Sequence, residues 1–137
     1  MNLIYPAVFY PCKQTGGYAV EVPDLPGCLS QGETLTEAML MINEAAAGWI
    51  LGEMEDGNPV PPPSPREAII PDSEEPDGFV NLISLDLDEH ARKFGRKVVR
   101  KNITIPAYLN TFAESQNLNF SKVLQESLAE KYARFHV

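Results

Sequence analysis

The sequence predicts an α+β protein in two parts: a body of strands around one long helix, and a small C-terminal part with one strand and two helices. Apolar residues alternate with polar ones near the N-terminus and then recur every three or four residues, which indicates strands followed by a helix. A second change from alternating to helical spacing follows residue 98. We therefore expect a body at residues 1–90, a bridge at 91–98 and a separate C-terminal domain at 99–137.

Three short strands are predicted at the N-terminus. Residues 3–10 are apolar and aromatic, and Pro6 interrupts them, so we expect a strand near a sheet edge, where a missing N–H is tolerated. The turn residues 14–17 lead to an alternating strand at 18–22, and a further turn leads to a third strand at 28–32. A meander of three strands should result.

A long helix should follow this meander. Thr34 and Glu37 have the spacing of a capping box, in which both side chains satisfy N–H groups of the first turn. The apolar side chains behind them recur at the helical period and predict one buried face that covers the sheet. The predicted face consists of Leu35, Ala38, Met39, Ile42, Ala45, Ala46, Trp49 and Ile50. The run DGNP at 56–59 should end the helix.

A proline-rich acidic connector is predicted at residues 57–78. Proline fixes φ and removes a donor, so we expect extended loop there and no regular packed element. Residues 79–87 are again strongly apolar and should return as a strand to the N-terminal sheet. Residues 88–95 then predict one or two helical turns that end at Gly95.

The charge of the chain is divided along its length. Residues 1–91 hold two basic and sixteen acidic side chains, a net charge of −14, whereas residues 92–137 hold nine basic and three acidic ones, a net charge of +6. An acidic body repels nucleic acid and attracts a basic protein, and a basic segment does the reverse. The sequence therefore favours two separate binding functions.

Several classes of protein do not fit the composition. No apolar run reaches the 18 or so residues of a membrane span, and the N-terminal residues lack the pattern of a secretory signal. Cys12 and Cys28 do not have the spacing of a metal site. We expect a cytoplasmic protein without a metal ion or cofactor.

The C-terminal strand is predicted at residues 99–106, with Ile103 and Ile105 on one face. The other face carries polar side chains: Arg100, Asn102 and Thr104. Pro106 should begin a first helix that runs to about residue 116, and Ser121 should cap a second helix.

Such a small segment cannot bury an apolar face alone, because it has neither a metal nor a disulfide to stabilise it. We therefore expect it to dimerise. The predicted dimer contacts are Ile103, Ile105, Phe112, Leu124 and Leu128. Two paired strands would form a ribbon that fits the major groove of B-DNA, where Arg pairs with guanine and Asn with adenine.

Residues 100–132, RKNITIPAYLNTFAESQNLNFSKVLQESLAEKY, resemble a ribbon-helix-helix DNA-binding domain. The strand that ends in I-T-I-P and the helix with S-x-x-L-x-x-x-L carry the resemblance. It implies that Arg100, Asn102 and Thr104 read bases, and that the backbone amides of residues 121–123 hold a phosphate. The predicted DNA contacts are Arg100, Lys101, Asn102, Thr104, Ser121 and Lys122.

Residues 5–50 are similar to the HicB antitoxin family. The similarity rests on Y-P-A-x-F, G-G-Y-x-V-x-x-P-D-L-P-G-C and S-x-G-x-T-x-x-E-A before a long helix. It implies a partial ribonuclease-H-like β-β-β-α-β body and a partner, HicA, which is a small basic toxin that cleaves mRNA. The two resemblances together imply an antitoxin that occludes this toxin and represses its own operon at operator DNA, as a homodimer or tetramer. The expected toxin contacts are Glu21, Asp24 and Glu33.

Two other functions are open to the sequence. Glu21, Asp24, Glu33 and Glu44 could converge on metal ions, as hydrolysis of the ribonuclease-H type requires, but turn chemistry explains Asp24 and a solvated helix face explains Glu44. His90 and His136 lie beside no nucleophile, so we expect no enzyme. The alternative is a ligand-sensing repressor without a toxin partner. Its pocket would be lined by Trp49 and by three methionines: Met39, Met41 and Met54.

Overall fold

The structure is a computed structural model that describes residues 1–135. Its contacts divide the chain into a body, Asn2–Arg96, and a C-terminal unit that begins at Lys97. His136 and Val137, the last two residues of the predicted domain at 99–137, lie outside the described residues.

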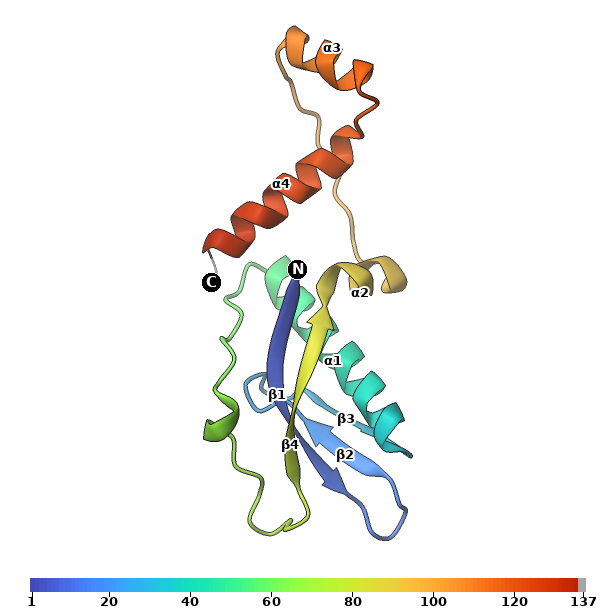
Figure 1. Cartoon of the computed structure of the whole chain (residues 1–137), viewed down its shortest axis with the longest axis vertical. Helices are drawn as coiled ribbons and strands as arrows, with labels where there is room; N and C mark the ends of the chain where they lie inside the picture. The colour runs from blue at the N-terminus through green and yellow to red at the C-terminus, as the bar shows by residue number, and fades with distance from the viewer. Residues whose placement is uncertain (136–137) are drawn as a thin grey trace. The chain divides into compact units, whose positions relative to one another are not determined.

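The body is built on a four-stranded antiparallel sheet (Figure 1). Strands β1 (Asn2–Pro11), β2 (Tyr18–Glu21) and β3 (Leu29–Gly32) form a meander. Strand β4 (Phe79–Asp86) returns to pair with β1, which gives the order β3-β2-β1-β4. The predicted meander and the predicted return of the fourth strand are both confirmed.

Strand β1 lies inside the sheet, so the prediction that Pro6 marks an edge strand is wrong. Strand β2 pairs with β1 only from Val8 to Pro11, whereas β4 pairs with β1 along most of its length. Pro6 thus has a neighbouring strand on one side only, which is the setting in which a missing N–H is tolerated. The strand is buried without a break from Tyr5 to Phe9.

Helix α1 (Leu35–Glu55) covers one face of the sheet (Figure 1). The Thr34 half of the predicted capping box is confirmed, because the N–H of Glu37 donates to Thr34 Oγ1 at 3.1 Å. The buried stripe is narrower than predicted and rich in small residues: Ala38, Ile42, Ala46, Ala47 and Ile50. Leu35 is exposed, and Trp49 is half-buried and donates from Nε1 to the Pro26 carbonyl at 3.1 Å. Small side chains allow the helix to approach the sheet closely.

The proline-rich connector has no regular structure apart from one short 3-10 turn, η1 (Arg66–Ala68), but it is fixed to the body. The Tyr5 hydroxyl donates to the carbonyl of Pro61. The Tyr10 hydroxyl accepts from the N–H of Asp72 at 3.1 Å. The connector therefore packs against the sheet through two tyrosines of strand β1.

Helix α2 (Leu87–Phe94) follows β4 directly. Asp86 caps it by accepting from the N–H of Glu89 at 3.0 Å, and Gly95 ends it in the left-handed region with φ 59°. The predicted stop at Gly95 is confirmed. Arg96 then donates from Nε and Nη2 to both carboxylate oxygens of Glu55, at 3.0 and 2.9 Å. This two-fold contact holds the end of the body on helix α1.

The C-terminal unit contains α3 (Ala107–Ser115) and α4 (Phe120–Phe135). The strand predicted at 99–106 is not formed in the single chain, because no neighbouring strand completes its hydrogen bonds. The predicted cap at Ser121 is also wrong. Helix α4 begins at Phe120, and its cap is Asn119, two residues before Ser121: Asn119 Oδ1 accepts from the N–H of Lys122 at 3.0 Å. Asn is as good a cap as Ser, so composition alone did not decide between them.

Candidate functional site

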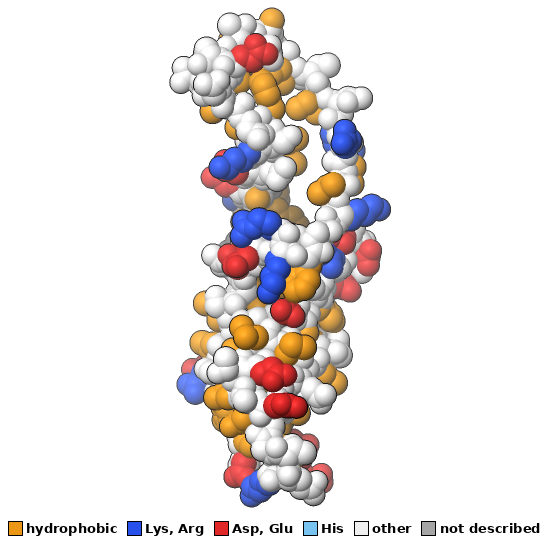
Figure 2. Space-filling model, turned by 90° about the vertical axis from the view of Figure 1, so that its right-hand side faces the viewer, with side chains coloured by type: hydrophobic (Ala, Val, Ile, Leu, Met, Phe, Trp, Pro, Cys, Tyr) orange, Lys and Arg blue, Asp and Glu red, His pale blue; other side chains and the backbone are white. Residues whose placement is uncertain are grey.

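The C-terminal unit exposes most of its apolar side chains. Within residues 97–135, Ala113 alone is buried, at 7% exposure. Large apolar side chains with at least a third of their surface exposed lie on the linker and both helices: Val98, Val99, Ile103, Ile105, Tyr108, Leu109, Phe112, Leu118, Phe120, Val123, Leu124, Leu128 and Phe135. All five predicted dimer residues belong to this set, and apolar atoms are visible on the surface of this unit in Figure 2.

A unit of this kind cannot be stable alone. Folding is driven mainly by removing apolar surface from water, at roughly 25 cal/mol per Å², and helices of this length gain most of their stability from a packed apolar face. The described unit offers α3 and α4 almost no buried face. It therefore needs a partner surface that covers its apolar side chains.

The predicted base-reading residues lie together in the irregular segment before α3. Arg100, Asn102 and Thr104 are exposed, as is the predicted phosphate contact Lys101. With Lys97 they form a basic segment that is open to solvent. Such a segment attracts polyanions, and the single chain does not fix the direction of its side chains.

The predicted phosphate site at the start of α4 is partly occupied by the chain itself. The N–H of Lys122 donates to Asn119 Oδ1, and the N–H of Val123 donates to the Asn119 carbonyl at 3.0 Å. Two of the three predicted amides are thus already bonded, so the amide site as predicted is wrong. The side chains of Ser121 and Lys122 are exposed, and Lys122 Nζ lies 4.0 Å from Glu126, too far for a strong ion pair.

The acidic residues expected to contact a toxin do not form one cluster. Glu21 ends β2 and weakly accepts from the Tyr10 hydroxyl at 3.5 Å. Glu33 is exposed beyond Gly32, which pairs with Tyr18 at the other end of β2. Asp24 is half-buried and bonded to the connector: its carboxylate accepts from the N–H and the hydroxyl of Ser64 at 2.8 and 2.6 Å.

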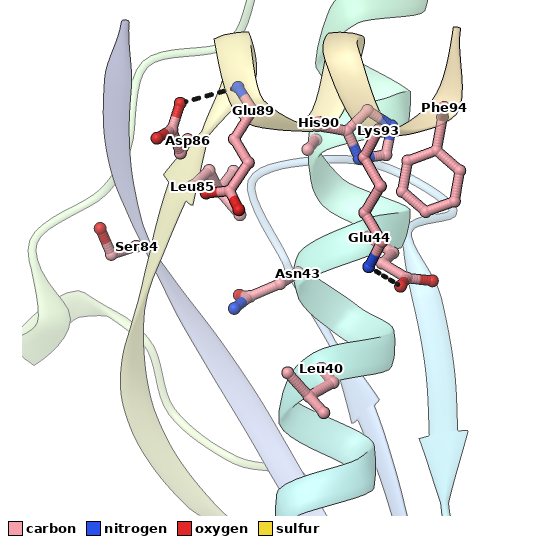
Figure 3. Close-up of a pocket in the computed structure, with 11 residues that line it drawn as sticks. Leu40, Asn43, Glu44, Ser84, Leu85, Asp86, Glu89, His90, Lys93 and Phe94 are labelled. Atoms are coloured by element: carbon pink, nitrogen blue, oxygen red, sulfur yellow. Dashed lines mark hydrogen bonds and ion pairs between the residues drawn. The ribbon is translucent and has the colours of Figure 1, made fainter.

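The body also contains a cleft that the sequence did not reveal. It lies between α1, the end of β4 and α2, and has a volume of about 240 Å³ (Figure 3). The polar residues that line it include Asn43, Glu44, Glu89, His90 and Lys93. Its walls come from two segments, residues 40–47 and 84–94, that are far apart in the sequence. The docking of α2 that closes the cleft has no signal in local periodicity. Trp49 and the three methionines expected of a ligand pocket do not line it.

The pKa of His90 in the cleft is shifted by its surroundings. Burial, with the nearby Arg96, lowers the pKa of His90 below its ordinary value, and Glu44 opposes this shift. The imidazole is therefore neutral at pH 7. Lys93 Nζ approaches Glu44 at 3.6 Å, but both side chains are largely exposed, so the pair is weak.

The described residues contain neither a cluster of metal ligands nor a helix that could span a membrane. Within residues 1–135 no three His, Cys, Asp or Glu side chains are placed to share a metal ion. None of the helices in the described chain is long and apolar enough to cross a membrane. Cys28 is buried, which raises the pKa of its thiol, whereas Cys12 is exposed in the first turn.

The chain is similar in sequence to a known protein family and to a phage protein. Residues 5–127 match a family model described as the HicB-like antitoxin of bacterial toxin–antitoxin systems. An uncharacterized 14.9 kDa protein of Haemophilus phage HP1 is 42% identical over 97 residues, which is 71% of this chain and 70% of the phage protein.

Two solved structures are also similar to this chain. A toxin–antitoxin complex from Streptococcus pneumoniae contains a chain that is 25% identical, with a TM-score of 0.60, and the match covers 96% of this chain and 99% of that one. The HicA3 and HicB3 toxin–antitoxin complex contains a chain that is 30% identical, with a TM-score of 0.51, and the match covers 61% of this chain and 99% of that one.

The role of Asp24 can be tested by stability. Asp24→Ala leaves the N–H and hydroxyl of Ser64 without their acceptor, so we expect a loss of about 1–3 kcal/mol in the free energy of unfolding. Ser64→Ala removes one of the two bonds and should cost less. Glu33→Ala, on an exposed side chain, should change stability by about 0.5 kcal/mol at most. Urea unfolding of the three variants measures this order, and equal values for Asp24→Ala and Glu33→Ala would show that the connector is not held by Asp24.

Proposed function

The chain belongs to the HicB-like antitoxin family of bacterial toxin–antitoxin systems, and on that premise we propose that it has two activities in one molecule. Its body binds and occludes a HicA-type toxin that cleaves mRNA. Its C-terminal unit forms a homodimer of the ribbon-helix-helix type, which binds operator DNA and represses the operon. The exposed apolar surface of the C-terminal unit is the observation that carries this proposal, because it calls for a second chain.

The proposed toxin binding is supported by the charge of the body and by the basic surface that an RNA-binding toxin needs. Residues 1–91 carry a net charge of −14, and acidic side chains are spread over the face of the body that Figure 2 shows. A toxin that binds RNA needs a basic surface, and an acidic protein competes with RNA phosphates for it. Toxin–antitoxin complexes are among the similar structures, which supports a protein partner for this chain.

The proposed dimer is supported by the extended segment before α3. Two antiparallel copies of residues 99–105 would supply each other with the hydrogen bonds that the single chain lacks. The same pairing would place Ile103 and Ile105 of both chains over the apolar sides of α3 and α4. Arg100, Asn102 and Thr104 would then lie together on the outer face of a two-stranded ribbon, which is a suitable width for the major groove.

Neutralisation of the toxin should need only the body. We expect residues 1–96, which include the docked α2 and Arg96, to inhibit mRNA cleavage by a HicA-type toxin. Salt should slow the association, because charge steers it. Cleavage assays with and without the fragment measure this, and a folded fragment that leaves cleavage unchanged would refute toxin occlusion by the body.

Assembly should depend on the apolar face of the C-terminal unit. Ile103→Asp places a charge where two chains would meet, so we expect loss of operator binding and a lower molecular mass in light scattering, with the body still folded. Ile70→Asp makes the same change at an isoleucine of the connector that is 84% exposed, and it should alter neither property. An unchanged mass with intact DNA binding for Ile103→Asp would exclude this dimer.

Substitutions should distinguish the residues that read bases from the residue that contacts phosphate. Arg100→Ala and Asn102→Ala should each weaken binding to operator DNA by about 1–3 kcal/mol and weaken binding to scrambled DNA less. Lys122→Ala should weaken both equally and reduce the salt dependence by about one unit. Titrations at several salt concentrations decide between these roles. Equal losses on both DNAs for the two ribbon variants would remove the claim of base reading.

A further inference from the structure

The cleft between α1 and α2 has more acceptors than its own donors satisfy. Three carboxylates line it, those of Glu44, Asp86 and Glu89, against the single ammonium group of Lys93. Asp86 uses one oxygen to cap α2. His90, the other titratable group of the lining, carries no charge at pH 7 and does not offset the carboxylates.

One buried amide oxygen points to a missing donor. Asn43 Oδ1 is shielded from solvent and accepts no hydrogen bond within the described residues. Figure 3 shows the Asn43 side chain reaching from α1 into the space below Glu89 and Leu85. Buried polar atoms of native proteins are almost always bonded, so an unsatisfied one calls for an unseen partner. Here that partner must be a hydrogen-bond donor.

The rim of the cleft is apolar and aromatic. Leu40 is 59% exposed and Phe94 is 48% exposed, and both line the cleft beside its carboxylates. The Phe94 ring already attracts a cation, because Lys93 Nζ lies 5.3 Å from its centroid. Since Lys93 is largely exposed and its contact with Glu44 is weak, an incoming cation with better geometry can displace it.

We propose that this cleft receives an arginine side chain of the basic toxin, and this proposal rests on the proposed function. The aliphatic stem of arginine fits the Leu40 and Phe94 rim, and its planar guanidinium offers five donors to the carboxylates and to the Asn43 amide. Lysine has a similar stem but presents a single point charge, which satisfies fewer acceptors. The cleft is thus an anchor point at which the acidic body holds the toxin.

Binding of the toxin to full-length variants tests this proposal. Glu89→Lys reverses a charge of the cleft, and Asn43→Leu removes the amide without changing charge. By isothermal titration calorimetry we expect affinity to fall by about tenfold or more for the first and by several-fold for the second. Glu74→Lys is the matched control, because it makes the same charge change in the exposed connector before the other end of β4 and should alter affinity by less than about twofold. Thermal unfolding shows whether each variant is folded.

The outcomes separate this proposal from the function on which it rests. If the wild-type chain binds the toxin and both folded cleft variants bind it as Glu74→Lys does, the arginine anchor is wrong and the antitoxin function stands. If the wild-type chain does not bind the toxin, both fail. The proposal is supported if replacing one toxin arginine by alanine weakens binding to the wild-type chain. The same toxin variant should bind Glu89→Lys with nearly the same affinity as the unchanged toxin does, because the arginine and Glu89 are then in contact and their effects do not add.

Discussion

The constraint on which the rest depends is that the C-terminal unit cannot bury its own apolar side chains. Two short helices and an extended segment present Ile103, Phe112, Leu124 and their neighbours to solvent, with Ala113 as the one buried apolar residue among the described residues of the unit. The proposed dimer would recover the cost of that exposure between chains. Under the proposed function, folding, dimerisation and DNA binding of this unit are one coupled process.

The body is organised in the opposite way and needs no second chain for its core. Strand β1 is buried from Tyr5 to Phe9, α1 covers one sheet face, and the connector is fixed by hydrogen bonds to the side chains of Tyr5, Tyr10 and Asp24. Its acidic surface is thus presented whatever the state of the C-terminal unit. An acidic body with its own core and a basic unit with exposed apolar side chains, joined in one chain, are the physical basis of the two proposed activities.

Most local features were predictable from the sequence, because local rules decide them; the cap of α4 was not, since Asn119 and Ser121 are equally suitable caps. The Thr34 cap, the helical period behind it and the stop at Gly95 all depend on residues within a few positions of one another. Features that depend on distant pairing were not. The central place of β1 requires β4, and Asp24 meets Ser64 forty residues later. The cleft was missed for the same reason, since Glu44 and Glu89 meet only when α2 docks on α1. The ribbon strand depends on a neighbour that the single chain does not provide.

Amide hydrogen exchange of the full-length protein over residues 99–105 tests the central claim most directly. If two chains pair through this segment, alternate amides between Arg100 and Thr104 should exchange slowly at high protein concentration and lose their protection on dilution. Fast exchange of the whole segment at every concentration, with α3 and α4 protected, would contradict the account. The C-terminal unit would then be stable without a paired strand, and its exposed apolar surface would need another explanation.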